Sequence, residues 1–311
     1  MNFDVLVIGD LNVDIVLSGS DIVPAFDQRE TLIEDATLTL GASAAIFACQ
    51  AARLGLRTAI IGAVGADLFG EYVLKTLGDR GVDVDACVTA PGLKTGVSVI
   101  LAPPGGSRAI LTYAGSMSVL RAAQIDAALF ARARHVHLAS YFLLEGLRSD
   151  LPQLLGQARS AGMTISLDPN WDPAERWQFD EIVPLCDVLL PNEAELLAIA
   201  RAPDVGSALA RLGSRTTLIA VKQGERGATA WRVGELMRCA ALPVEVVDTT
   251  GAGDSFDAGF VFGVLRGWSL TETLTLACAC GSLSTRSVGG TASQPTLEEA
   301  LRYASRANAP G

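Results

Sequence analysis

Short continuous apolar runs recur along most of the chain, and several are followed by a segment with helical spacing of its apolar residues. Such runs are typical of strands buried in a parallel sheet. Because strand and helix patterns alternate, they predict an α/β fold with a mostly parallel sheet and helices on both faces. The runs lie at 5–8, 58–62, 135–140, 164–168, 188–190 and 217–222. The helical patterns lie at 41–54, from after a turn at 65–70 to about 80, at 148–161 and from 193 onward.

Two regions interrupt this rhythm with polar and apolar residues in alternation. Residues 95–101 and 108–113 alternate on either side of the Pro/Gly segment 103–106, which predicts a β-hairpin. With the weakly alternating segment 12–37, the hairpin would form a small separate sheet; a meander packed on the main domain is the alternative. We therefore expect a main α/β domain and a small β-sheet, with the boundaries 1–11, 38–92 and 114–311 for the former and 12–37 and 93–113 for the latter.

The most informative stretch is Asp248-Thr-Thr-Gly-Ala-Gly-Asp254, which precedes a helical pattern. The β-branched run at 243–247 predicts a strand before it. Gly251 and Gly253 allow backbone N–H groups to turn toward one point, and a helix N-terminus adds free N–H groups and the positive end of its dipole. Together these features predict an anion site.

Asp254 stands at this predicted anion site, where its carboxylate would repel a bound phosphate. That placement is understandable if Asp254 accepts a proton from a hydroxyl while the N–H groups stabilise charge on a transferring phosphoryl group. The alternative is that Asp254 only caps the helix.

A second polar group follows the first buried strand. Asp10, Asn12 and Asp14 alternate with apolar residues and so share one face of an extended segment. Carboxylate and amide groups on one face suit the vicinal hydroxyls of a sugar, which both donate and accept hydrogen bonds. A solvated edge strand would show the same pattern.

Composition narrows the functional classes. The 311 residues are 50% hydrophobic and 19% charged, with a net charge of −10 and a pI of about 4.7. This acidity argues against nucleic acid or an anionic membrane as the main partner. No uncharged apolar run is long enough for a membrane span, and the start of the chain lacks a basic segment typical of a secretory signal. The scattered cysteines predict reduced thiols, so we expect a cytoplasmic protein.

The stretch ending at Asp254 resembles the signature of the ribokinase, or PfkB, family of carbohydrate kinases. Further motifs in family order extend the resemblance from Gly9 to Pro295. It implies a three-layer α/β/α ribokinase-like fold whose small β-sheet is a lid over the sugar and often a dimer surface. The implied reaction transfers the γ-phosphoryl group of ATP to a hydroxymethyl group of a sugar.

The resemblance also implies roles for individual residues. Asp254 would be the base, and Gly251, Ala252 and Gly253 the anion hole. The sugar would contact Asn12, Asp14, Gly41 and Ala42. Asn192 and Glu195 match the family's N-x-x-E motif, which orders Mg²⁺ through water. The alternative is a helix capping box formed by the same two residues, and both roles can hold together.

The nucleotide region is implied by later motifs. Lys222 and Gly224 lie in a strand–turn–strand segment that resembles the family's nucleotide loop, although a plain hairpin would look alike. Cys278 and Gly281 belong to a small-residue helix against which adenine could lie. Asp248 and Thr250 match the region where the family holds a monovalent cation, with K⁺ as the candidate.

Four positions depart from the family pattern, and the sugar stays unidentified. Ala42 replaces a glycine, while Ile46 and Cys278 stand where the family has asparagine; Asp172 also replaces an arginine, so no phosphate clamp is assigned there. A nucleoside kinase of the same fold and a non-catalytic sugar-binding relative remain alternatives. A dinucleotide-dependent dehydrogenase is disfavoured, because the segment from Gly9 lacks the dinucleotide-binding glycines.

Overall fold

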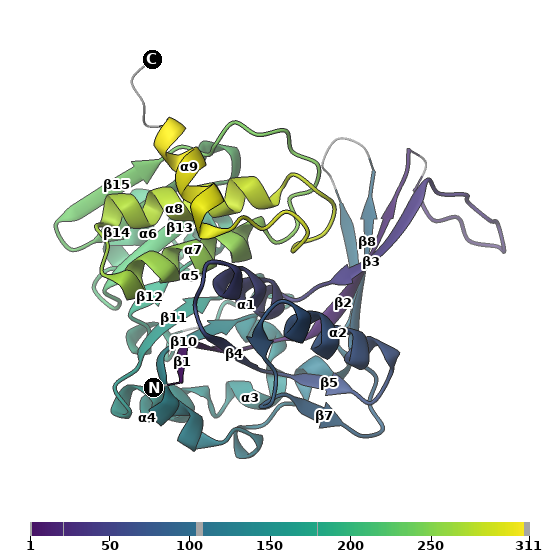
Figure 1. Ribbon diagram of the computed structural model, residues 1–311, viewed down its shortest axis with the longest axis horizontal. Helices are drawn as coiled ribbons and strands as arrows, with labels where there is room; N and C mark the ends of the chain where they lie inside the picture. The colour runs from purple at the N-terminus through teal and green to yellow at the C-terminus, as the bar shows by residue number, and fades with distance from the viewer. Residues whose placement is uncertain (1, 21, 104–107, 179, 308–311) are drawn as a thin grey trace.

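A mostly parallel sheet forms the centre of the protein, as seen in the computed structural model, which describes residues 2–20, 22–103, 108–178 and 180–307 (Figure 1). Over those residues the sheet has nine strands, and only the two pairings at one edge are antiparallel. The edge-to-edge order is β15 (Glu235–Cys239), β14 (Ala228–Arg232), β13 (Leu218–Lys222), β12 (Val188–Leu189), β11 (Thr164–Asp168), β10 (Ala133–Ala139), β1 (Phe3–Ile8), β4 (Thr58–Ile61) and β6 (Val82–Asp83).

Helices cover both faces of this sheet, as the continuous apolar strands require. In β1, Val5 and Val7 point into one core, whereas Leu6 and Ile8 point into the other. The first core is covered by α1 (Ser43–Arg53), α2 (Leu68–Asp79), α7 (Ala252–Arg266), α8 (Leu270–Ser284) and α9 (Leu297–Ala307). The second is covered by α3 (Glu145–Arg148), α4 (Leu151–Ser160), α5 (Glu193–Ala200) and α6 (Val205–Leu212). The expected three-layer α/β/α architecture is confirmed.

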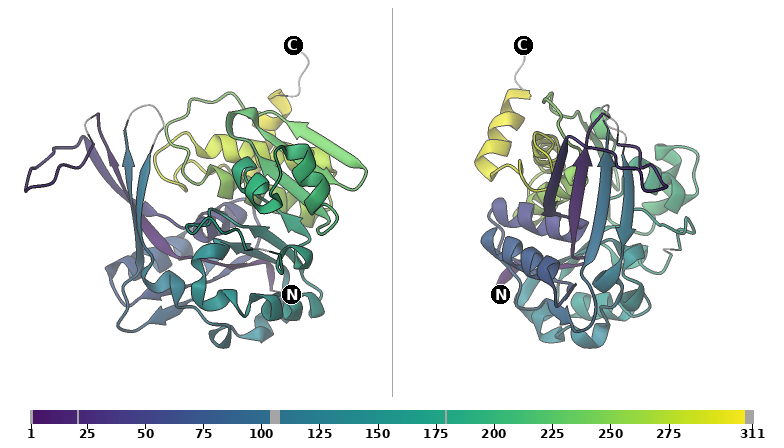
Figure 2. Two further views of the ribbon diagram at one scale, coloured as in Figure 1. Left: turned by 180° about the vertical axis from the view of Figure 1, so that it is seen from behind. Right: turned by 90° about the vertical axis from the view of Figure 1, so that its right-hand side faces the viewer.

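A separate small sheet projects beside the main body (Figure 2). Its strand order is β3 (Asp35–Leu40), β2 (Asn12–Ser18), β8 (Gly96–Ala102) and β9 (Ala109–Tyr113). The antiparallel pairing of β8 with β9 is the hairpin predicted from the alternating pattern; the turn expected at 103–106 lies largely outside the described residues. β2 lies between β3 and β8 and is therefore not an edge strand.

The strand expected at 243–247 is wrong. These residues form an irregular connection without strand pairing, and Val246 and Val247 are each 56% exposed. β-branched residues favour extended backbone, but a strand also needs a neighbour whose N–H and C=O groups are free. The antiparallel edge position is taken instead by β15, which the sequence pattern did not single out, and a two-stranded sheet of β5 (Ala63–Gly65) and β7 (Val88–Ala90) was likewise not anticipated.

Candidate active site

The glycine turn before α7 has the geometry of an anion site. Gly251 is the residue that caps the N-terminus of α7, with φ at +72°, and no side chain caps the helix. A Cβ at Gly251 would lie 2.7 Å from Cα of Gly290, so the close backbone approach excludes larger residues. The N–H of Ala252 donates to the carbonyl oxygen of Thr249 at 3.3 Å, whereas the next N–H groups of the first turn have no side-chain cap and can face a ligand.

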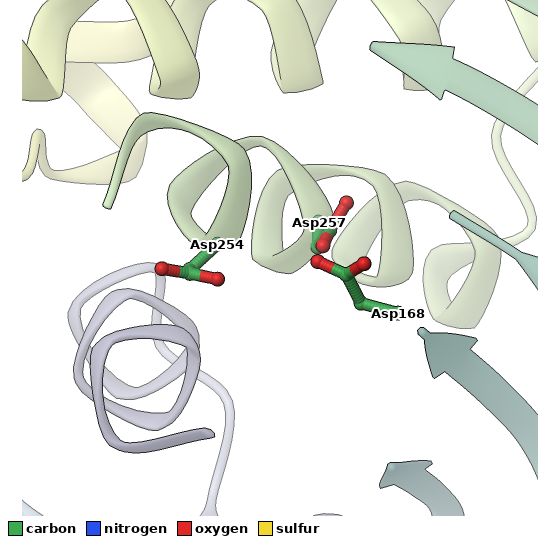
Figure 3. Close-up of side chains that lie close together, drawn as sticks. All are labelled: Asp168, Asp254 and Asp257. Atoms are coloured by element: carbon green, nitrogen blue, oxygen red, sulfur yellow. The ribbon is translucent and has the colours of Figure 1, made fainter. Parts of the chain in front are cut away.

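Asp254 lies in the first turn of α7 and not at its cap, so the capping alternative has no support. Asp254 is only 8% exposed. Its side chain points toward α1, which is drawn in faded purple in Figure 3. Burial raises the pKa of Asp254 to about 8, and the nearby charge of Asp168 acts in the same direction. The ammonium of Lys222 and a hydrogen bond from Ser43 oppose this rise.

Asn12 and Asp14 form a buried polar pair at the start of β2, at 3% and 6% exposure. The Nδ2 atom of Asn12 donates to Oδ1 of Asp14 at 3.0 Å and to the hydroxyl of Ser98 at 3.3 Å. A Cβ at Gly41 would lie 2.2 Å from Oδ1 of Asp14, so the sequence needs glycine there. The solvated edge-strand alternative is therefore wrong.

Burial raises the pKa of Asp14 to about 7, while the Asn12 hydrogen bond lowers it. The charge of Asp10 acts to raise the pKa of both Asp14 and Asp254, so Asp10 is near both groups. Asp10 itself accepts a hydrogen bond from the N–H of Ala44, at the start of α1. Asp10, which follows β1, Asp14 of β2 and Asp254 of α7 thus form one acidic region.

Lys222 ends β13 inside a cluster of acidic side chains. Its Nζ atom donates to Oδ2 of Asp168 at 2.7 Å and to Oδ2 of Asp257 at 2.9 Å. Carboxylate oxygens of Asp168, Asp254 and Asp257 lie within 4.8 Å of one another, a spacing that could hold a metal ion (Figure 3). Because the Lys222 ammonium already pairs with two of these three carboxylates, the cluster is better described as a lysine site than as a metal site.

Comparison with known proteins supports the family suggested by these motifs. The pfkB family carbohydrate kinase model matches residues 2–297. The chain belongs to the pfkB family of carbohydrate kinases. It is 31% identical to a fructokinase from Klebsiella pneumoniae, over 97% of this chain and 99% of the relative.

Solved structures show the same ribokinase-like fold. A protein from E. coli described as a ribokinase II, in complex with ATP and Mg²⁺, superposes with a TM-score of 0.86 at 26% identity and covers 98% of this chain and 99% of its own. The adenosine kinase of Sinorhizobium meliloti superposes with a TM-score of 0.86 at 27% identity, covering 98% and 100% of the two chains. This pfkB-family member is therefore a carbohydrate kinase by family.

The N-x-x-E motif of this pfkB-family chain forms the capping box that was the alternative explanation. Oδ1 of Asn192 accepts from the N–H of Glu195 at 2.9 Å, and Oε2 of Glu195 accepts from the N–H of Asn192 at 2.8 Å. Glu195 is nevertheless 4% exposed, and burial, together with Asp168, raises its pKa to about 7. A buried carboxyl of this kind can still interact with a cation through water.

The residues expected to hold the nucleotide lie in different environments. Gly224 has φ at +58°, and a Cβ there would meet no atom within 4 Å, so this turn faces open space. Cys278 is 4% exposed and its thiol lies 3.8 Å from the carbonyl oxygen of Cys239. A Cβ at Gly281 would approach the Ala252 carbonyl oxygen to 3.0 Å, so Gly281 has a packing role between α7 and α8.

Two departures from the family pattern are visible beside the glycine turn. Ala42 immediately precedes α1 with φ at +66°, a conformation that strongly favours the family's glycine. Ile46 packs where the family has asparagine: Cβ atoms at Gly251 and Gly290 would lie 2.9 and 2.5 Å from its side chain. An apolar side chain thus supports the turn from the side of α1.

Asp248 holds the loop before the turn through both of its carboxylate oxygens. Oδ1 accepts from the N–H and the hydroxyl of Thr250 at 2.8 and 2.7 Å, while Oδ2 accepts from the N–H of Gly289 at 2.8 Å. Arg108, beside the start of β9, donates to the Thr250 hydroxyl at 2.5 Å and lies 3.6 Å from Oδ1 of Asp248. An arginine of the small sheet therefore reaches the main domain.

Several residues of this region were not assigned a role from sequence. Asp10 and Asp168 were noted at strand ends, where parallel sheets place functional groups, but neither was assigned. Asp257 lies one helical turn after Asp254, and that i, i+3 spacing was an available signal. Ser43 and Arg108 carried no such signal, because only tertiary packing brings them to the site. The residues of this region without an assigned role are Asp10, Ser43, Arg108, Asp168 and Asp257.

Proposed function

We propose that this chain transfers the γ-phosphoryl group of ATP to a hydroxymethyl group of a sugar. The observation that carries the proposal is the placement of Asp254, a buried carboxyl group in the first turn of α7 directly after the Gly251–Gly253 turn. The relatives that are named fructokinase, or were determined with ATP and Mg²⁺, support the same reaction.

In this proposal each part of the site has one task. Asn12 and Asp14 bind sugar hydroxyls from β2, and Gly41 and the backbone at Ala42 close the same side. Asp254 accepts the proton of the attacking hydroxyl. The N–H groups of Gly251, Ala252 and Gly253 stabilise the charge on the transferred group, a contribution that relies on donors fixed before the reaction.

The nucleotide and its metal are assigned to the opposite side of the turn. Lys222, Gly224, Cys278 and Gly281 line the proposed nucleotide region, with Gly224 the member of this set that faces open space. Asn192 and Glu195 would organise Mg²⁺ through water, and the buried carboxyl of Glu195 suits that task. When bound, Mg²⁺ would neutralise phosphate charge.

We further propose a K⁺ site beside Asp248 and Thr250. Both oxygens of Asp248 already accept hydrogen bonds, and Arg108 supplies a positive charge there. A bound K⁺ would therefore depend mainly on backbone carbonyls. Initial rates in KCl and in tetramethylammonium chloride at equal ionic strength test this, and equal rates would remove K⁺ from the proposal.

We also propose that the small sheet is a lid over the sugar and a surface for a second copy of the chain. Its β9 strand exposes Ile110, Leu111 and Tyr113 by 53–64%, and β9 is an edge strand with unpaired backbone groups. Light scattering of the parent and of an Ile110→Lys, Leu111→Lys variant tests the dimer; a monomeric parent would contradict it.

Release of ADP that depends on an added acceptor tests the proposed function. The panel contains fructose, ribose, a 2-keto-3-deoxy sugar acid and adenosine, each assayed with ATP and Mg²⁺. We expect one neutral sugar to give the highest kcat/KM. Adenosine as the best substrate would favour the second candidate, a nucleoside kinase, which the similarity to adenosine kinase supports. No ADP release with any acceptor would support a non-catalytic sugar-binding protein.

A further inference from the structure

Lys222 connects four separate parts of the candidate active site. Its ammonium bonds Asp168 at the end of β11 and Asp257 on α7. A Cβ at Gly253 would lie 3.5–3.8 Å from the last three atoms of the Lys222 side chain, so that side chain lies directly against the anion turn. The backbone N–H of Lys222 donates to the carbonyl of Pro191 at 3.0 Å, beside the cap of α5.

The charge of Lys222 is fixed by this environment. The side chain is only 13% exposed, and the paired side chains of Asp168 and Asp257 are 3% and 1% exposed. Burial acts to lower the pKa of Lys222, but the carboxylates of Asp168, Asp257 and Glu195 outweigh burial and raise it. Moving this buried ammonium away would leave two buried carboxylates without a counter-charge, which is strongly unfavourable.

We propose that Lys222 is a positioning residue for phosphoryl transfer, whose clamped ammonium holds the Gly253 turn in place and favours the ionised, proton-accepting form of the neighbouring Asp254. This inference rests on the proposed function of Asp254. It assigns Lys222 a role beyond nucleotide contact, and it assigns Asp168 and Asp257 the task of holding the ammonium.

The charges that face Asp254 come from each element packed around it. Asp10 follows β1, Asp168 ends β11, Lys222 ends β13, and Ser43 begins α1. Asp257 lies on the same helix as Asp254, within the carboxylate cluster. Lys222 is the cation of this set, and the other charged members are acidic. The ammonium therefore offsets a field that would otherwise keep a proton on Asp254.

Two substitutions with opposite charge effects test the inference. Asp254 must be ionised to accept a proton, so kcat/KM of the parent should rise with pH through about 8, the pKa of that carboxyl. Lys222→Met should move this rise to higher pH by roughly one unit or more, because a nearby cation is lost. Asp168→Asn should move it to lower pH, because a nearby anion is lost.

Lys75→Met is the matched control, since Lys75 is an exposed lysine paired with Asp79 on α2, and it should leave the profile unchanged. If Lys222→Met does not fold, Lys222→Gln takes its place, because its amide can still donate to one carboxylate. A structural role alone would lower activity in both Lys222 and Asp168 variants without opposite shifts, and that result would overturn the inference.

A measurement independent of turnover uses protein stability. The difference in Tm between each protein and its Asp254→Asn derivative reports the ionisation of Asp254 as pH is varied. We expect the Lys222 variant to show this transition at higher pH than the parent; an unchanged transition contradicts the inference. If Asp254→Asn itself keeps parent activity, the proposed base fails, which is a different outcome from failure of the Lys222 assignment.

Discussion

Asp14 is a buried side chain to which the proposed function assigns recognition of the acceptor. Burial raises its pKa to about 7, so near neutral pH it is present as both carboxyl and carboxylate. Oδ1 of Asp14 already accepts a bond from Asn12. The remaining carboxyl oxygen is suited to a hydroxyl of the acceptor.

Asp14→Ala is expected to lower kcat/KM for the sugar, because charge-assisted hydrogen bonds to the acceptor are not made. The loss corresponds to about 2–4 kcal/mol of transition-state stabilisation. The KM for ATP should change little. Asp14→Asn keeps the size of the side chain and serves as the control for packing. Steady-state kinetics provide the test. If the Asp14→Ala enzyme has the same kcat and KM for the sugar as the parent, β2 is not part of the site.

Residue types were informative from sequence where a motif fixed the local backbone. The glycine turn and Asp254 could be located, since both the turn and the helix start depend on neighbouring residues. His135 and His137 are buried core residues: both form hydrogen bonds with the Ser166 hydroxyl, and His137 stacks on Phe47. The acidic partners of Lys222 could not be found, because β11, β13 and α7 meet only in the folded chain.

At the scale of elements, α1 begins under backbone strain. Ala42, the residue before the helix, has φ at +66° and is 8% exposed, and its methyl group makes no cap hydrogen bond; Asp10 accepts from the N–H of Ala44 instead. An L-residue with a Cβ is disfavoured in this conformation by about 1–3 kcal/mol, whereas glycine is not.

Ala42→Gly should therefore stabilise the protein by about 1 kcal/mol, after the loss of a small buried methyl group and the greater freedom of the unfolded chain are allowed for. Urea denaturation measures the change. Ala52→Gly, within α1, is the control and should destabilise by about 1 kcal/mol. Destabilisation by both substitutions would show that the Ala42 backbone is not strained.

Element order followed from sequence more readily than element boundaries. Alternation of apolar runs with helical patterns predicted the parallel sheet, since both signals are periodic over many residues. The 243–247 segment was mistaken for a strand because extended preference alone does not provide a pairing partner. Strand β6, with two residues, lies outside every predicted run and is defined only by its neighbour in the sheet.

At the scale of the whole molecule, the small sheet and the main domain meet at the site. Asn12 and Asp14 belong to the small sheet, Asp254 to the main domain, and Arg108 contacts Thr250 across the two. No helix in the described ranges is long and apolar enough to span a membrane. Relative motion of the small sheet would open and close the space between β2 and α7.

Hydrogen exchange should detect that motion. With saturating sugar, amides of β2, β8 and β9 are expected to exchange more slowly, because closure orders the lid and excludes water. Helix α4 covers the face of the main sheet that α7 does not cover. It provides an internal control, and its amides should exchange at an unchanged rate. Equal protection of the small sheet with and without sugar would contradict a moving lid.

Asp254→Asn tests the central claim most directly, because the amide keeps the size and a hydrogen-bonding oxygen but cannot act as the base. Asp79→Asn, an exposed carboxylate on α2, is the control. We expect a folded protein by circular dichroism, ATP binding at least as tight as in the parent because a negative charge is lost, and kcat lower by about 10²–10⁴-fold. A folded Asp254→Asn protein that binds ATP and phosphorylates the sugar at near the parent rate would contradict the proposed mechanism.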